Sequence, residues 1–193
     1  MICCKSDSES ARIAADYLMR GEVVVLPTDT VYGFSGLVDD ERRVFHTDAK
    51  IRNLKRRDDG KPFIQLIEKP TDLVRYTRDF VPDAVLARWP GALTVVVRTP
   101  RADDAYATTA FRCPGDEWLR RVISLCGAPL YSTSVNRSGS PVLDNVQAIA
   151  DEFGNEIPLI VDDGNRRSNI PSTIVSLAVD GSITLVRQGA VML

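Results

Sequence analysis

An uninterrupted apolar run that ends in a proline and a group of polar side chains is the most distinctive hydropathy pattern in this chain. The run is Val23–Pro27, and Thr28-Asp29-Thr30 follow it directly. Such a valine-rich run is typical of a strand covered on both faces. Pro27 cannot continue a hydrogen-bond ladder, so we expect the chain to turn there. Polar residues just beyond a strand of an open α/β sheet bind ligands in many proteins. They also make ordinary turns, and this segment alone leaves both interpretations open.

The rest of the chain alternates between helical and strand patterns. Apolar residues at helical spacing, each series closed by a glycine, predict helices over Ser8–Arg20, Glu117–Cys126 and Asn145–Phe153. Short runs rich in Val, Ile and Thr predict strands at Phe63–Ile67, Leu93–Arg98, Leu130–Thr133, Leu159–Val161, Thr173–Leu177 and Ile183–Val186. Helices interspersed with strands predict an α/β fold in which helices pack on a sheet. The chain shows no repeat and no convincing linker, so we expect one domain over residues 1–193.

Composition places the chain among soluble globular proteins. Hydrophobic residues make up 44% and charged residues 26%, which is the balance of an ordinary folded domain. No apolar segment approaches the ~20 residues that a membrane-spanning helix needs. The N-terminus lacks the apolar core of a secretory signal, so we expect a cytoplasmic protein. The cysteines show no CxxC spacing and no nearby histidines, which predicts reduced thiols and no metal site. His46 is the single histidine, which argues against a histidine-based nucleophile.

Cationic side chains are concentrated in one segment of a nearly neutral chain. The formal net charge is −2, yet Lys50–Arg57 carries five cations and no acid. Proteins that grip a nucleic-acid backbone are usually basic overall, so a local anion site is favoured over an RNA-binding surface. We expect Lys55, Arg57 and Lys61 to form an anion clamp, since Arg offers a planar fork and Lys a compact charge. A solvated basic loop is the alternative. No glycine-rich phosphate loop of the known types is present, so any nucleotide is bound in another way.

A second strand also runs directly into hydroxyls and an amide. The segment Leu130–Gly139 contains Ser132, Thr133, Ser134 and Asn136. These side chains suit recognition of a ribose, a base or an amino acid, but the same residue types also make plain turns. Elsewhere in the chain, Arg112 and Arg187 stand at the ends of extended runs and Ser172 begins one, and each of the three could be structural.

Taken together, these segments resemble the YrdC-like family, whose main members are L-threonylcarbamoyladenylate synthases. The motifs are, in family order, Pro27–Gly33, Lys55–Arg57 with Lys61-Pro62, Trp89–Thr94, Arg112–Pro114, Ser132–Gly139, Pro171–Thr173 and Arg187–Gly189. The resemblance runs from about Ala11 to Ala190 and is to the short, single-domain form. It implies a twisted mixed β-sheet with flanking helices around a large concave, positively charged cavity.

The resemblance also implies a reaction and a set of site residues. The reaction joins L-threonine, bicarbonate and ATP into threonylcarbamoyl-AMP with release of pyrophosphate, with Mg²⁺ expected on the ATP. Other proteins then use the adenylate to modify an adenosine of tRNA. By the family pattern, the residues that contact L-threonine are Thr30, Arg112, Ser134 and Ser172. Those that hold ATP are Lys55, Arg57, Lys61, Thr108, Asn136 and Arg187, with Lys55 and Arg57 as the catalytic pair.

Several positions depart from the family pattern. Phe34-Ser35 stands where Leu-Gly is usual, Asp58 where Pro is common, and Val135 where a small Ala is usual. Asp144 replaces a Ser or Thr that commonly helps bind the nucleotide, and we leave it out of the site. These departures keep two rivals open: a YrdC-like paralogue with a different carbamoyl substrate, and a non-catalytic RNA-binding module that uses Lys50–Arg57.

Overall fold

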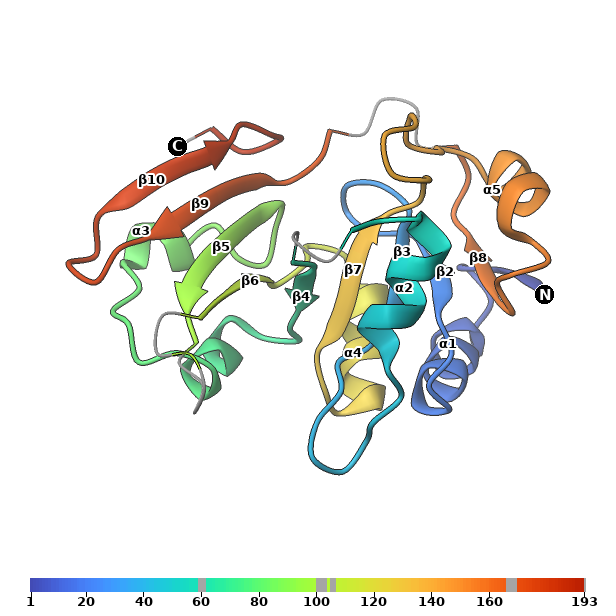
Figure 1. The fold of residues 1–193 in the computed structure, drawn as a ribbon, viewed down its shortest axis with the longest axis horizontal. Helices are drawn as coiled ribbons and strands as arrows, with labels where there is room; N and C mark the ends of the chain where they lie inside the picture. Colours follow the sequence, from blue (N-terminus) through green and yellow to red (C-terminus); the bar gives the residue numbers. More distant parts are fainter. Residues whose placement is uncertain (59–61, 100–103, 105–106, 166–169, 193) are drawn as a thin grey trace.

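Strands and helices alternate along the chain, as the hydropathy pattern predicts (Figure 1). The computed structural model describes residues 1–58, 62–99, 104, 107–165 and 170–192. The strands are β1 (Ile2–Cys4), β2 (Val24–Leu26), β3 (Gly33–Leu37), β4 (Ile64–Leu66), β5 (Leu93–Arg98), β6 (Thr108–Arg112), β7 (Leu130–Ser134), β8 (Ile160–Asp162), β9 (Thr173–Leu177) and β10 (Ile183–Arg187). The helices are α1 (Ser10–Met19), α2 (Thr47–Lys55), α3 (Asp83–Leu86), α4 (Glu117–Cys126), α5 (Val146–Phe153) and the 3₁₀ helix η1 (Pro70–Arg75). Every helix and strand predicted from the pattern is present.

The described strands form one mixed sheet, which confirms the predicted α/β class. Their order is β1-β8-β2-β3-β7-β4-β6-β5-β9-β10. Four neighbouring pairs are parallel, namely β1·β8, β2·β8, β4·β6 and β5·β9, and the remaining pairs are antiparallel. The sheet twists along its length, with the two termini at opposite ends of the molecule (Figure 1).

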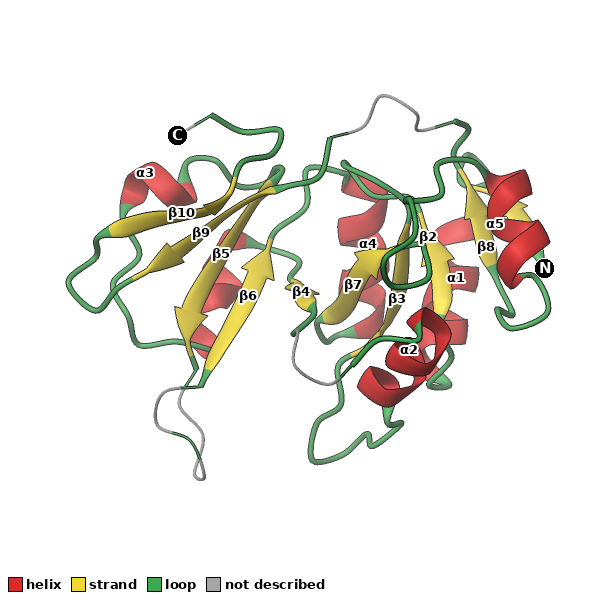
Figure 2. Ribbon diagram, turned by 45° about the horizontal axis from the view of Figure 1, so that its top comes forward, coloured by secondary structure: helices red, strands yellow, loops and turns green. Residues whose placement is uncertain are grey.

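Helices cover both faces of the sheet around β2, β3 and β7 (Figure 2). On one face α1 and α4 pack on a buried cluster that includes Leu26, Leu66 and Leu130. On the other face α2 and α5 pack with Phe34, whose ring meets that of Phe153 edge to face at 4.9 Å. Phe34 is therefore a core contact between the sheet and α5.

In the half of the sheet formed by β5, β6 and β9, the helices η1 and α3 cover the face opposite to the one that carries Arg112. Leu66 faces α1 and α4 and is the register partner of Arg112, so this face continues from β4 onto β6. The opposite face of β5, β6 and β9 carries Phe111 and Val175, which pack with the residues of η1 and α3. The face that carries Arg112 is thus left to form the wall of a cavity.

Strand β3 was not anticipated, because Gly33 and Gly36 disfavour strands. It forms between β2 and β7, where it pairs on both edges. Close packing explains one of its glycines, since a Cβ on Gly36 would lie 2.4 Å from Thr47 Cγ2. Tertiary contacts override local propensity here.

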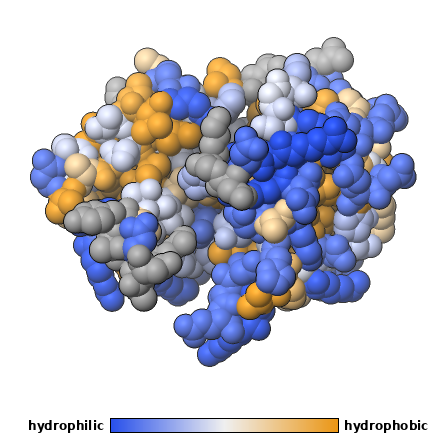
Figure 3. Space-filling model, in the orientation of Figure 1, coloured by the Kyte–Doolittle hydropathy of each residue, from blue (hydrophilic) through white to orange (hydrophobic). Residues whose placement is uncertain are grey.

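The surface differs in character between the two ends of the molecule (Figure 3). The side that carries α2 is largely hydrophilic, whereas apolar side chains gather near the edge strand β10. In β10, Ile183, Leu185 and Val186 are exposed.

All four cysteines are free thiols, and burial raises the pKa of Cys113 to about 11. Among the described helices, none has the length and apolar character needed to cross a membrane.

Candidate active site

A cavity of about 320 Å³ lies where the β2–β3 loop meets β4, β6, β7 and the facing ends of β9 and β10. Within the described part of the chain its lining includes the three arginines Arg57, Arg112 and Arg187, and no carboxylate. Six hydroxyl side chains also line it, namely Thr28, Thr30, Ser132, Thr133, Ser134 and Ser172. Cationic forks beside neutral hydroxyls suit an anionic ligand that also carries hydroxyl or amino groups.

Arg112, the last residue of β6, is held by the loop that follows β2. Its Nη1 donates to Thr30 Oγ1 at 2.9 Å, and the Thr30 and Thr28 hydroxyls are hydrogen-bonded at 2.9 Å. The residue is 3% exposed. Burial lowers the pKa of Arg112 from its usual range, while Asp29 acts in the opposite direction. In the described part of the chain, Arg112 Nε is buried and has no hydrogen-bond partner.

Arg187 reaches the cavity because β10 contains a bulge. Leu185 pairs with Val175, but the register shifts so that Arg187 pairs with Ile174, which lines the cavity. A bulge of this kind re-aims the side chain that follows it. Arg187 Nη2 donates to the Ser172 carbonyl at 2.8 Å, and Ser172 Oγ is 2.8 Å from Thr94 Oγ1. Burial lowers the pKa of Arg187.

Arg57 lies on an aromatic ring at the edge of the cavity. The Phe63 ring centroid is 4.9 Å from Arg57 Cζ and 4.9 Å from Arg52 Cζ. Arg56 takes a left-handed conformation, with φ 49°, and this turn follows directly on the end of α2. The Arg57 Nε is buried and has no hydrogen-bond partner among the described residues. Burial and the nearby Arg52 lower the pKa of Arg57, while Asp48 acts in the opposite direction.

Lys55 lies behind the cavity wall rather than in its lining. Its Nζ donates to the Ser134 carbonyl at 2.5 Å, to the Asn136 carbonyl at 3.0 Å and to Asn136 Oδ1 at 2.7 Å. Ser134 Oγ also donates to Asn136 Oδ1, at 2.8 Å. Burial, assisted by Arg57, lowers the pKa of Lys55 to about 8. The lysine therefore orders the segment that carries Ser134 and Asn136.

The structure brings most of the predicted site residues together. Six of the ten line the cavity, namely Thr30, Arg112, Ser134, Ser172, Arg57 and Arg187. Lys55 and Asn136 lie directly behind Ser134. Thr108 is exposed at the start of β6 and does not line the cavity. Lys61 lies outside the described residues. Which ligand each of these residues binds stays a prediction.

Several described lining residues were not in the predicted set, among them Thr28, Ser132 and Phe63. Thr28 and Ser132 are part of the hydroxyl clusters that the sequence displays, so the signal for both was present. Phe63 was assigned only to a strand; its place directly after Lys61-Pro62 is the signal that could have marked it.

Asp144, which was left out of the site, does not line the cavity, and its Oδ1 accepts from Asn145 Nδ2 at 3.0 Å. Val135 is fully buried in the core with α5.

A twisted mixed sheet with a cavity of arginines and hydroxyls defines an α/β protein with a site for a polar anionic ligand. The Sua5/YciO/YrdC family model, described as "Telomere recombination", matches residues 16–189. The chain belongs to this family, as the ordered motifs predicted.

Several curated relatives in this family have the name threonylcarbamoyl-AMP synthase. One, from Pyrococcus abyssi, is 32% identical over 86% of this chain and 50% of its own length. Another, from Pseudoalteromonas translucida, is 28% identical over 92% of this chain and 98% of its own length. This chain thus spans half the length of the first relative and nearly all of the second.

A solved structure supports the same assignment of fold. The crystal structure of P. abyssi Sua5 complexed with L-threonine matches with a TM-score of 0.83 and 28% identity. The match covers 98% of this chain and 57% of that chain. The YrdC-like fold predicted from the motifs is thereby confirmed.

Proposed function

We propose that this protein synthesises L-threonylcarbamoyl-AMP from L-threonine, bicarbonate and ATP, with release of pyrophosphate. The observation that carries the proposal is the cavity in which Arg57, Arg112 and Arg187 face a set of hydroxyls with no carboxylate among the described lining residues. Both substrates with fixed charges, the amino acid carboxylate and the triphosphate, are anions that arginine forks bind well. Relatives named threonylcarbamoyl-AMP synthase support the choice of substrates.

The threonine side of the proposed site is the region around Arg112. Arg112 lines the cavity, and its guanidinium is the proposed partner of the substrate carboxylate. Thr30, Ser134 and Ser172 offer hydroxyls for the amino and hydroxyl groups of threonine. A threonine complex is the subject of the matched P. abyssi structure, which supports this assignment.

The nucleotide side of the proposed site runs from Arg57 to Arg187. Their guanidinium groups carry the charge that would balance the phosphates. Lys61, Thr108 and Asn136 are assigned to the nucleotide by the family pattern alone. Mg²⁺ would arrive on the phosphates of ATP, since the described lining supplies no carboxylate of the kind that usually holds this ion.

The proposed chemistry needs no nucleophile from the protein. The threonine amine and bicarbonate combine to a carbamate with loss of water. A carbamate oxygen then attacks the α-phosphorus of ATP, the bond to the β,γ-diphosphate breaks, and pyrophosphate leaves. Catalysis is then the positioning of two anions and the stabilisation of charge on the phosphoryl group. The arginines supply that charge, and downstream proteins would take the adenylate to tRNA in the cytoplasm.

The rival RNA-binding role is disfavoured by the contacts of the basic segment. Lys50 Nζ donates to the Gly21 carbonyl at 2.7 Å, and Arg52 pairs with Asp48 and donates to the Asp58 carbonyl at 2.8 Å. Lys55 points inward to Asn136. These cations serve the fold more than an exposed phosphate-binding surface, and a steep salt dependence of RNA affinity is not expected.

Pyrophosphate release with single omissions tests the proposal. We expect release that requires ATP, L-threonine and bicarbonate together, and that falls at least tenfold when any one is left out. Equal release with L-serine, or with carbamoyl phosphate in place of bicarbonate, would favour the paralogue.

A further inference from the structure

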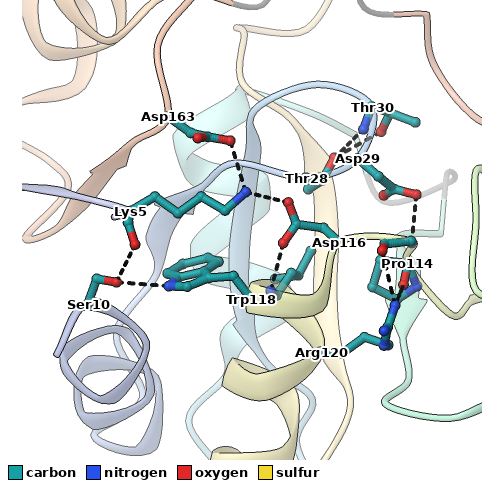
Figure 4. Close-up of polar contacts among 12 residues, drawn as sticks. Lys5, Ser10, Thr28, Asp29, Thr30, Pro114, Asp116, Trp118, Arg120 and Asp163 are labelled. Atoms are coloured by element: carbon teal, nitrogen blue, oxygen red, sulfur yellow. Dashed lines mark hydrogen bonds and ion pairs between the residues drawn. The ribbon is translucent and has the colours of Figure 1, made fainter. Parts of the chain in front are cut away.

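Asp29 contacts the turn behind the cavity wall, although its neighbours Thr28 and Thr30 line the cavity. Its side chain points to the turn at Pro114-Gly115, away from Thr30 (Figure 4). Asp29 Oδ2 accepts the Gly115 N–H at 2.9 Å, and Oδ1 lies 3.4 Å from Arg112 Nη2. One carboxylate therefore touches both the guanidinium and the turn that follows it in the chain.

This arrangement matters because Arg112 is a buried cation. Burial and the nearby Arg187 lower the pKa of Arg112, and Asp29 is the carboxylate that acts against them. A buried charge without a counterion is costly, and it moves toward any group that relieves it. Asp29 and Thr30 hold the guanidinium from two directions, through Nη2 and Nη1.

The contact between Asp29 and Arg112 is an ion pair that leaves hydrogen-bonding capacity unused. In the described part of the chain, neither Asp29 Oδ1 nor Arg112 Nε has a hydrogen-bond partner. Arg112 is thus fixed by charge and by Thr30 while its Nε donor is kept free. A closed bidentate pair with Asp29 would have consumed that donor.

We propose that Asp29 is a positioning residue, which holds the Arg112 guanidinium in place to receive the carboxylate of the amino acid substrate. The inference rests on the proposed threonine site. It makes Asp29 necessary for amino acid affinity without contact to the ligand, and unnecessary for nucleotide affinity.

The test compares D29N with D116N by calorimetric titration of L-threonine and, separately, of ATP. Asp116 belongs to the same turn and makes a matched control: Oδ1 caps α4 by accepting the Leu119 N–H at 3.0 Å, and Oδ2 pairs with Lys5 at 2.5 Å. We expect D29N to raise the threonine Kd about tenfold, because the Arg112 guanidinium loses the ion pair that holds its Nη2. Its ATP Kd stays within about twofold. D116N changes neither Kd by more than about twofold, and it lowers the melting temperature because the ion pair with Lys5 is lost.

Three results separate the possible outcomes. An unchanged threonine Kd in D29N, or equal losses for threonine and ATP, would overturn the role of Asp29. If D29N does not melt cooperatively, D29E is used, which keeps the charge but displaces it by one methylene. D29E is expected to raise the threonine Kd at least threefold. A wild-type threonine Kd in D29E would overturn the inference. A wild-type protein that binds no threonine contradicts the proposed function instead.

Discussion

Lys55 Nζ lies 2.7 Å from Asn136 Oδ1, so the last residue of α2 is bonded to the segment that follows β7. The two residues are far apart in the chain, yet the same ammonium also holds the Ser134 carbonyl. All of its donors are directed at this one segment. Lys55 therefore acts on the site by fixing Ser134 and Asn136. Its removal is expected to affect both the activity and the stability of the protein.

Lys55→Met is expected to lower the rate of adenylate formation at least a hundredfold while the protein still folds. Methionine fills a similar volume but leaves the Ser134 and Asn136 acceptors unpaired, which costs about 2 kcal/mol of unfolding free energy. Single-turnover kinetics and urea denaturation measure the two effects. Turnover at the wild-type rate would refute the role of Lys55.

The pH dependence of activity follows from the same residue. Burial lowers the pKa of Lys55 to about 8, so its ammonium is lost at a lower pH than that of an exposed lysine. Because the protonated form makes the hydrogen bonds to Ser134 and Asn136, kcat/KM should be highest below this pKa and fall as pH rises through it. A profile that is flat from pH 7 to pH 9 would contradict this assignment.

Arg57→Lys is expected to raise the KM for ATP about tenfold, since lysine keeps the charge but loses the planar fork that lies on Phe63. The matched control is Arg56→Ala, which removes an exposed cation from the adjacent position. Steady-state kinetics for both variants decide the point. A wild-type KM for ATP in Arg57→Lys would show that the planar fork is not needed for ATP binding.

Gly189→Ala is expected to damage the site without changing any of its functional side chains. A Cβ at this position would lie 2.2 Å from the Pro171 carbonyl oxygen and 2.4 Å from the Ser172 carbonyl carbon. The backbone would have to move, and with it Ser172 and the carbonyl that holds Arg187. We expect a melting temperature lower by about 5 °C or more, together with a loss of activity. Unaltered melting and activity would show that the backbone yields at no cost.

Much of this site could be predicted from residue order alone. The strand that ends at Pro27 is fully buried in β2, and the hydroxyls after it do line the cavity. Arg112 and Thr30 could be assigned to one site because the ordered motifs belong to a known family. The helices over Glu117–Cys126 and Asn145–Phe153 follow from apolar spacing closed by glycine.

Other features depend on contacts that no local pattern carries. Strand β3 forms from Gly-Phe-Ser-Gly-Leu only because β2 and β7 pair with both of its edges. The bulge that turns Arg187 into the cavity is a property of the β9–β10 register. Lys55 lies behind Ser134 because of a hydrogen bond between residues far apart in the chain. The motif therefore predicted that Lys55 belongs to the site, but not that it lies behind the cavity wall.

Mass spectrometry with ¹³C-labelled bicarbonate tests the central claim most directly. The protein is incubated with ATP, Mg²⁺, L-threonine and the labelled bicarbonate, and the nucleotide products are analysed. The account predicts threonylcarbamoyl-AMP that carries one ¹³C atom, absent when threonine is omitted and at least a hundredfold reduced with Lys55→Met. An AMP product without the label, or no adenylate at all from a protein that binds both ATP and threonine, would contradict it.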